Sequence, residues 1–222
     1  MVMVPGAQAK AQGTFTCPET PAATYTLAID SQDVQIIENA GPEQLRGLYD
    51  QHNRAHGHYG SSPADNQHAV IGGLHHGELR LRSEIKMLQA TRSDSSMACL
   101  GVQVLELSLV YKPVIYISRT KPRGSCEYQA ALQHEYKHLT TDLRILRDWV
   151  PSLRDAAKAG LDKVAQPMRV RATDLARARD DIQRRVVAPL DRVMDQVEAE
   201  RDRQQSAIDT PEEYERVARQ CP

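Results

Sequence analysis

Two histidines and a glutamate stand close together in the sequence at a spacing that suits metal chemistry. His134 and His138 are four residues apart, and Glu135 directly follows the first of them. On an α-helix, residues i and i+4 lie one above the other, so the two imidazoles can reach one zinc ion. Glu135 would then be placed to activate a water bound to that ion. The H-E-x-x-H pattern therefore predicts a zinc site with His134 and His138 as ligands and Glu135 as general base, provided that this segment is helical.

The surrounding residues predict the helix that this spacing requires. Ser125 is a suitable N-cap, and the carboxylate of Glu127 would interact favourably with the positive end of the helix dipole. No glycine or proline interrupts the segment before Pro151, which is expected to open the next helix. We therefore expect a helix from Ser125 to Val150.

This helix should be covered by protein on two sides. At about 100° per residue, a stripe opposite the histidines is apolar and is expected to face the core. Glu135 and Asp142 lie beside the histidines on a side that is continued by apolar residues, and a covered face with ionisable groups suits a metal site because unpaired buried charge is unfavourable. The expected core stripe is Leu132, Tyr136, Leu139, Leu143, Leu146 and Val150, and the histidine side is continued by Ala131, Ile145 and Trp149.

The pentapeptide HEYKH resembles the zinc-binding signature of the zincin metallopeptidases. The resemblance implies that His134 and His138 bind zinc, that Glu135 is the general base, and that the substrate is a peptide or protein. The order of a cysteine-containing strand region, the strand PVIYIS and the H-E-x-x-H helix is also similar to bacterial proteins described as predicted secreted zinc-dependent proteases. Two departures matter: Lys137 is charged where zincins usually carry an uncharged residue, and Arg144 occupies the third-ligand position of the metzincins.

The third zinc ligand is therefore open. The candidates are Glu198 and Glu200 on a long C-terminal helix, and His75 and His76 at the turn before a strand. Asp142 lies two helical turns beyond His134, roughly 12 Å along the helix axis, so we expect it to support His138 from outside the coordination sphere.

A second kind of function is compatible with the same residues. The chain could be a non-enzymatic protein, either a helical binding module or a scaffold whose zinc is structural. A fourth protein ligand that closes the coordination sphere would favour this alternative. Hydrolysis of denatured proteins that depends on Glu135 would favour the enzyme.

Length and charge restrict the class of protein. The chain has 222 residues, of which 41% are hydrophobic and 26% charged, as is ordinary for a globular protein of one or two domains. The net charge of −1 and the interspersed signs give no electrostatic reason to expect nucleic acid or anionic lipid as a partner. No apolar run approaches the roughly 20 residues that span a membrane. The sequence does not indicate an oligomeric state.

Residues 1–20 are expected to form a tail outside the domain. The segment MVMVPGAQAKAQG contains the small-residue patterns A-Q-A and A-K-A, which are similar to signal-peptidase cleavage sites. We interpret this tail as the remnant of an incomplete signal peptide, which predicts a periplasmic or secreted protein.

The cysteine pattern agrees with export. The four cysteines are Cys17, Cys99, Cys126 and Cys221. No C-x-x-C pair is present, which argues against a zinc ribbon or a thioredoxin-like site, and two disulfides suit an exported protein. Three connectivities are possible, and we favour Cys126 with Cys221 and Cys17 with Cys99. Four buried free thiols in a cytosolic protein are the alternative.

The first half of the chain is expected to form a small sheet. Alternating apolar residues predict strands at Thr24–Asp30 and Gly77–Gln89, and the more continuously apolar Leu100–Tyr111 should be the central strand. Val114–Ile117, which follows Pro113, should be an edge strand. That edge could be an ordinary one, or it could hold an extended peptide by β-addition.

The other segments are expected to be helices and a loop. A helix is predicted at residues 42–56, where His52 and His56 could form a second metal site or interact with the helix dipole, and a loop at residues 57–73. Everything after Val150 is expected to be helical, with Pro189 kinking or splitting a long helix and a short last helix capped by Thr210. The prediction is one α+β domain over residues 21–222, sheet-rich over 21–120 and helical over 121–222, with the small sheet packed on the metal helix.

Overall fold

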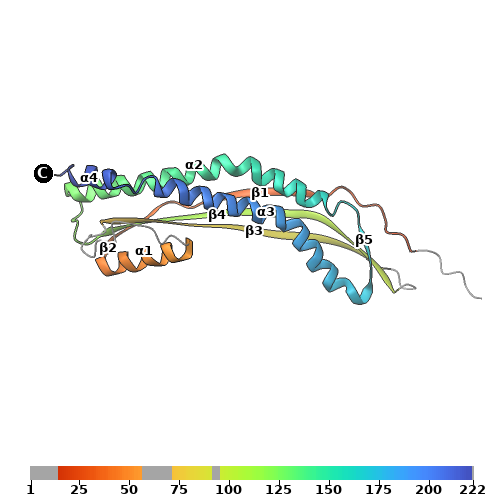
Figure 1. The fold of residues 1–222 in the computed structure, drawn as a ribbon. Helices are drawn as coiled ribbons and strands as arrows, with labels where there is room; N and C mark the ends of the chain where they lie inside the picture. The colour runs from red at the N-terminus through yellow and green to blue at the C-terminus, as the bar shows by residue number, and fades with distance from the viewer. Residues whose placement is uncertain (1–14, 57–71, 92–95, 222) are drawn as a thin grey trace, which may run out of the picture.

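The computed structural model describes residues 15–56, 72–91 and 96–221, and in these residues a sheet and a set of helices lie side by side along an elongated molecule (Figure 1). The predicted α+β class is confirmed. The elements in chain order are β1 (Thr24–Ser31), β2 (Gln35–Ala40), α1 (Pro42–His56), β3 (Gly73–Thr91), β4 (Met97–Ser118), α2 (Cys126–Asp162), β5 (Met168–Arg171), α3 (Leu175–Ser206) and α4 (Pro211–Ala218).

Strand β4 is the centre of the sheet, because each of the other four strands pairs with it. Strands β1 and β2 follow one another along one edge of β4 in parallel, while β3 and β5 are antiparallel to β4. The central position predicted for Leu100–Tyr111 is confirmed, and the strand is longer than predicted at both ends.

The prediction of an edge strand at Val114–Ile117 is wrong, because this segment is the last part of β4 and has a partner on each side. Val114 pairs with Gln35 of β2 and with His76 of β3. Pro113 is tolerated inside the strand because it falls between the end of β1, where Ser31 pairs with Tyr111, and the start of β2. The missing N–H of Pro113 therefore removes no hydrogen bond from either parallel ladder.

The long helix α2 runs through Pro151, so the predicted end at Val150 is wrong. Its predicted start is confirmed, since the backbone N–H of Tyr128 donates to Ser125 Oγ at 3.1 Å. A proline inside a helix costs about 3 kcal/mol. The helix continues because its apolar face does, through Leu153, Ala156, Ala157 and Leu161, all of which are buried.

The histidine side of α2 is covered by protein, as predicted, whereas the opposite stripe is only partly covered. His134, Glu135 and His138 are each at most 6% exposed, and Asp142 is fully buried. The predicted core stripe is wrong at two positions, because Tyr136 is 36% and Leu143 is 40% exposed. The sheet and α3 pack against the buried side of α2, whereas these two side chains lie on its exposed surface.

The C-terminal half is not entirely helical, because β5 lies between α2 and α3. Residues Met168–Arg171 pair with Met97–Leu100 at the start of β4. Four residues are too few to show the alternation by which a strand is recognised in sequence. Helix α3 contains Pro189 and continues through it as one helix, so the possible split at this residue is not observed. The predicted cap of α4 is confirmed, with the backbone N–H of Glu213 donating to Thr210 Oγ1 at 3.2 Å.

Two disulfides join distant parts of the chain, and both have the connectivity that we favoured. Cys17 is bonded to Cys99 with a Cα–Cα distance of 5.5 Å, and Cys126 is bonded to Cys221 with a Cα–Cα distance of 5.6 Å. Phe15, near the first bridge, is only 9% exposed, so the last residues of the expected tail are attached to the domain. Residues 1–14, residues 57–71 of the segment predicted to be a loop, and the side chains of His52 and His56 lie outside the described residues. No described helix is both long and apolar enough to cross a membrane.

The crossing of α2 and α3 depends on Gly160, where the two backbones approach closely. A Cβ atom at this position would collide with the backbone carbonyl oxygen of Val186 in α3, and neither backbone can move without disturbing the core. We predict that Gly160→Ala lowers the free energy of unfolding by about 2–3 kcal/mol. Gly47→Ala is the matched control, because this exposed helical glycine of α1 has open space at its Cβ position.

The comparison is made by urea denaturation of the oxidised proteins. The control should gain about 0.5–1 kcal/mol, since alanine favours a helix more than glycine does. Equal gains in the two variants would show that α2 and α3 do not meet in this way.

Candidate metal centre

The donor atoms of two histidines and one aspartate meet at one end of the molecule. His134 Nε2 lies 3.2 Å from His138 Nε2, and Asp209 Oδ1 lies 3.1 Å from the first and 3.2 Å from the second. Within the described residues, these three form a group whose geometry could hold a metal ion. The two histidines of the H-E-x-x-H motif are thus brought together as predicted, and Asp209 joins them.

Two parts of the chain position these three side chains. Helix α2 supplies the histidines from successive turns of its covered side, which places their rings 4.9 Å apart in an edge-on arrangement. The connection between α3 and α4 supplies Asp209. This residue precedes the N-cap Thr210, and its Oδ1 accepts a hydrogen bond of 2.8 Å from the hydroxyl of Tyr214 in α4. The aspartate is therefore held by a cap and a tyrosine as well as by the histidines.

The second nitrogen of each imidazole faces an acceptor outside the donor group. His138 Nδ1 donates to the side-chain carbonyl oxygen of Gln205, and His134 Nδ1 lies 3.3 Å from Glu213 Oε1. A metal-binding histidine commonly donates its other ring N–H to a carboxylate or carbonyl, which fixes the tautomer and the ring orientation. Both Nε2 atoms are thereby available to a metal ion.

The electrostatic field of the centre favours positive charge. Burial alone would lower the pKa of His138, but the hydrogen bond and charge of Asp209, with Glu135 and Gln205, outweigh it and raise the pKa to about 9. The same balance raises the pKa of His134. Burial would raise the pKa of Asp209, but hydrogen bonds from the two histidines hold it well below its usual range. A site that stabilises a protonated imidazole beside a carboxylate also suits a divalent cation, which replaces the proton.

These donors fit zinc in chemistry and in spacing. Two imidazole nitrogens and a carboxylate oxygen are ordinary zinc ligands, with bond lengths of about 2.0–2.2 Å. Two ligands at such bond lengths and a tetrahedral angle would be about 3.3–3.5 Å apart, close to the three observed separations.

Glu135 is buried between α2 and the beginning of β3. A Cβ atom on Gly73 would lie 2.6 Å from Glu135 Oε1, so the glycine makes room for this carboxylate. The backbone N–H of His75 also donates to Glu135. Burial raises the pKa of Glu135 to about 7, against the opposing effect of His138 and His134. The predicted general base is therefore shielded from water, lies beside the two histidines and has a pKa near neutral pH.

A buried ion pair supports the centre from the side of the sheet. Arg201 of α3 donates to Asp142 from Nε at 3.0 Å and from Nη2 at 2.8 Å. Asp142 also accepts hydrogen bonds from Tyr111 Oη at 2.9 Å and from Gln205 Nε2 at 2.7 Å. Since the same Gln205 accepts from His138, Asp142 supports this histidine indirectly. This agrees with the expected role outside the coordination sphere.

The four residues considered as the third ligand lie elsewhere. Glu198 accepts from Arg201 at 2.8 Å, and Glu200 pairs with Arg203 and Gln204. His76 is exposed. His75 is nearer: its ring stacks on that of His138 with centroids 6.3 Å apart, and its Nε2 donates to Tyr111 Oη at 3.2 Å. It is a neighbour of the donor group and not a member of it.

Asp209 was missed because it lies in a short connection with no periodicity of its own. A usable signal was nevertheless present in the cysteine pairing. A bridge from Cys126 to Cys221 brings the last residues of the chain to the start of the metal helix, so acidic residues shortly before Cys221 were the natural candidates.

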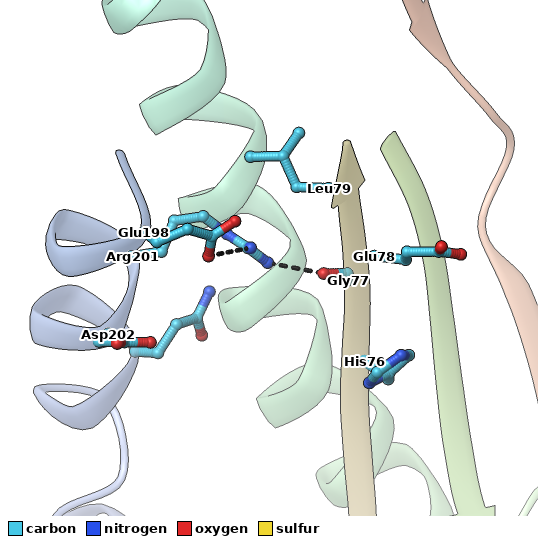
Figure 2. Close-up of a pocket in the computed structure, with 8 residues that line it drawn as sticks. His76, Gly77, Glu78, Leu79, Glu198, Arg201 and Asp202 are labelled. Carbon is cyan, nitrogen blue, oxygen red and sulfur yellow. Dashed lines mark hydrogen bonds and ion pairs between the residues drawn. The ribbon is translucent and has the colours of Figure 1, made fainter. Parts of the chain in front are cut away.

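A small cleft opens beside the centre, between β3 and α3 (Figure 2). Its volume is about 200 Å³. Figure 2 shows Arg201 reaching from α3 to the backbone carbonyl of Gly77, a hydrogen bond of 2.8 Å, with Glu198 on its other side. Gln205 also lines this cleft. Because Gln205 also contacts His138, the cleft lies next to the candidate donor group.

No protein-family model matches this chain, and neither a curated protein nor a solved structure does. The site is therefore interpreted from its own geometry and chemistry.

Proposed function

We propose that the protein is a zinc-dependent hydrolase of peptide bonds. The observation that carries the proposal is the group formed by His134, His138 and Asp209, with Glu135 buried beside it. Three protein ligands with one open position are characteristic of catalytic zinc sites, whereas structural sites have four. The resemblance of HEYKH to the zincin signature supplies the peptide bond as the target.

In this proposal the chain's own residues hold the metal and move one proton. His134, His138 and Asp209 bind the ion, while Gln205 and Glu213 keep the two imidazoles in the metal-binding tautomer. Zinc, when bound by these residues, would polarise a carbonyl group and lower the pKa of an attacking water. Glu135 would take the proton of that water and pass it to the leaving amine.

We further propose that the protein acts in the periplasm or outside the cell. Two disulfides are present, and disulfides persist in oxidising compartments.

Metal binding tests the site directly. We predict that Asp209→Ala weakens zinc binding by at least about a hundredfold, because loss of partners outside a coordination sphere already costs about ten- to a hundredfold. A His134→Ala, His138→Ala double variant should retain no zinc. Affinity is measured by competition with a chromophoric chelator, and zinc content by elemental analysis.

Glu200→Ala is the matched control for the aspartate variant. It removes an acidic side chain of the same region that pairs with Arg203 and not with the histidines. Its zinc affinity should be that of the parent protein. Zinc at full stoichiometry in the double histidine variant would show that the metal binds elsewhere.

A structural zinc site in a non-enzymatic protein is the second candidate. It is favoured by the fact that no residue of α4 is buried, so a metal held by Asp209 would help to attach this helix. Cobalt substitution separates the two functions. A hydroxamate ligand should change the visible spectrum of the cobalt protein if the coordination sphere has an open position, and should leave the spectrum unchanged if it does not.

A further inference from the structure

The last residues of the chain form a segment that is attached to the rest of the molecule in an unusual way. We call residues 207–221 the C-terminal arm; it contains Asp209, α4 and Cys221. No residue of α4 is fully buried, and its Tyr214 and Val217 are only half-buried. Polar contacts and the disulfide therefore contribute much of what holds the arm in place.

The arm contacts α2 at two places. At the metal centre, Asp209 contacts both histidines, Glu213 contacts His134 and Lys137, and the ring of Tyr214 lies 5.5 Å from that of His134. At the other end, Cys221 is bonded to Cys126, the first residue of α2. Figure 1 shows α4 beside the beginning of α2. The metal donors and the disulfide therefore hold the two ends of one short segment against one helix.

We propose that the Cys126–Cys221 disulfide is a redox control of the metal centre. This inference rests on the proposed metal site. While the bridge is intact, it keeps Glu213 and Tyr214 beside His134 and Asp209. When the bridge is reduced, the end of the arm separates from α2 and these outer partners are lost. Asp209 stays tethered to α3, which ends at Ser206, so the metal affinity is lowered and not abolished.

The reduction itself is ordinary thiol–disulfide exchange. A dithiol, small or on an oxidoreductase, supplies two electrons and two protons. The bond between Cys126 Sγ and Cys221 Sγ breaks, two thiols form, and the dithiol becomes a disulfide.

The two bridges of the molecule differ in their access to such a reductant. Cys126 is exposed, whereas Cys99 of the other bridge is only 3% exposed. Exchange requires that a thiolate reaches a disulfide sulfur, so the Cys126–Cys221 bridge is the more accessible one. The Cys17–Cys99 bridge, in which Cys17 is half-buried and Cys99 is buried, lies near the opposite end of the sheet and is a natural internal control.

The coupling between zinc binding and oxidation of the Cys126–Cys221 bridge is necessarily reciprocal. If reduction lowers the zinc affinity by a given factor, zinc binding favours the oxidised bridge by the same factor. Loss of partners outside the coordination sphere predicts a factor of about ten to a hundred.

The first test compares zinc affinities of two double variants with that of the parent protein. Cys126→Ser, Cys221→Ser should bind zinc about ten- to a hundredfold more weakly, and serine avoids new thiolate ligands. Cys17→Ser, Cys99→Ser should retain the parent affinity. Circular dichroism confirms that each variant is folded.

The second test uses the unmodified chain and does not depend on folding of a variant. The protein is equilibrated with mixtures of reduced and oxidised glutathione, with a fixed concentration of free zinc or without zinc, then alkylated and analysed by mass spectrometry. Zinc should lower the ratio of reduced to oxidised bridge by about tenfold or more for Cys126–Cys221, and should not change it for Cys17–Cys99. The protection should disappear in Asp209→Ala.

The outcomes separate this inference from the proposed function. Zinc binding by the parent protein with equal affinity in Cys126→Ser, Cys221→Ser would overturn the redox control and leave the metal site intact. Equal labelling of Cys126 with and without zinc would do the same. A parent protein that binds no zinc would overturn both.

Discussion

Glu135→Gln is expected to bind zinc as the parent protein does and to hydrolyse peptides at least about a thousandfold more slowly, within the range that a positioned general base contributes. Glutamine has the shape of glutamate and its carbonyl oxygen can still accept the hydrogen bond from the backbone of His75. It cannot accept a proton from the attacking water. The measurement is the rate of cleavage of denatured proteins or of a diverse peptide library, alongside elemental analysis of zinc.

The control for this variant is Glu200→Gln, an equivalent change at a carboxylate that pairs with Arg203 outside the donor group. It should cleave peptides at the rate of the parent protein. Cleavage by Glu135→Gln at an undiminished rate would mean that hydrolysis does not use this site. Cleavage that disappears together with the zinc would mean that Glu135 is needed for the metal and not for proton transfer.

Arg201→Met is expected to lower the free energy of unfolding by about 3–5 kcal/mol, because it leaves the carboxylate of Asp142 buried without its cation. Asp142 is fully buried, and Arg201 is 8% exposed. Methionine retains the apolar stem of the arginine and fills much of its volume. Urea denaturation at pH 7 measures the change.

Arg203→Met is the matched control on the same helix. Its guanidinium is exposed and pairs with Glu200, so its removal should change stability by no more than about 1 kcal/mol. A double variant, Arg201→Met with Asp142→Leu, should recover part of the lost stability, because a buried apolar pair can replace a buried ion pair. An Arg201→Met protein as stable as the parent would show that Asp142 is not buried as an anion.

The pH dependence of the Arg201→Met defect has a definite sign. In the parent protein, burial would raise the pKa of Asp142, but the hydrogen bonds and charge of Arg201 lower it. A lowered folded-state pKa contributes stability above the unfolded value of about 3.9, and this contribution is lost as the pH falls through the folded-state pKa. Without Arg201, burial raises the pKa instead, and the unpaired carboxylate is destabilising at high pH. The difference between the two proteins should therefore shrink as the pH is lowered from neutrality.

The sequence was most informative where local chemistry decides the structure. The helix of the H-E-x-x-H motif begins at its predicted cap, the histidine side of that helix is covered, and the cysteines pair as favoured. These predictions depend on spacing, capping and a small number of pairings. The cap and the spacing of the histidines involve residues that are close in sequence. The cysteines are few, and in an exported protein they are expected to form disulfides.

The errors concern positions where packing overrides a local preference. Pro151 and Pro113 disfavour a helix and a central strand, yet the buried face of α2 continues past the first, and the second falls where one parallel partner gives way to the next. Asp209 has no local signal that marks it as a ligand. It reaches the two histidines only because the turn after α3 and the disulfide at Cys221 return the end of the chain to α2.

Because every strand pairs with β4, the strand pairings can be ordered by the length of chain that lies between the paired residues. Strand β3 ends at Thr91 and β4 begins at Met97, so their antiparallel pairing closes a very short loop. The parallel pairing of β1 joins Thr24 to Val104, residues that are about 80 positions apart. Closing a longer loop costs more chain entropy. The β3–β4 hairpin, which carries Gly73 and His75 toward the metal helix, is therefore the least costly part of the sheet to assemble. Strand β1 then pairs with the β4 strand of this hairpin, and the bridge from Cys17 to Cys99 links the chain before β1 to β4.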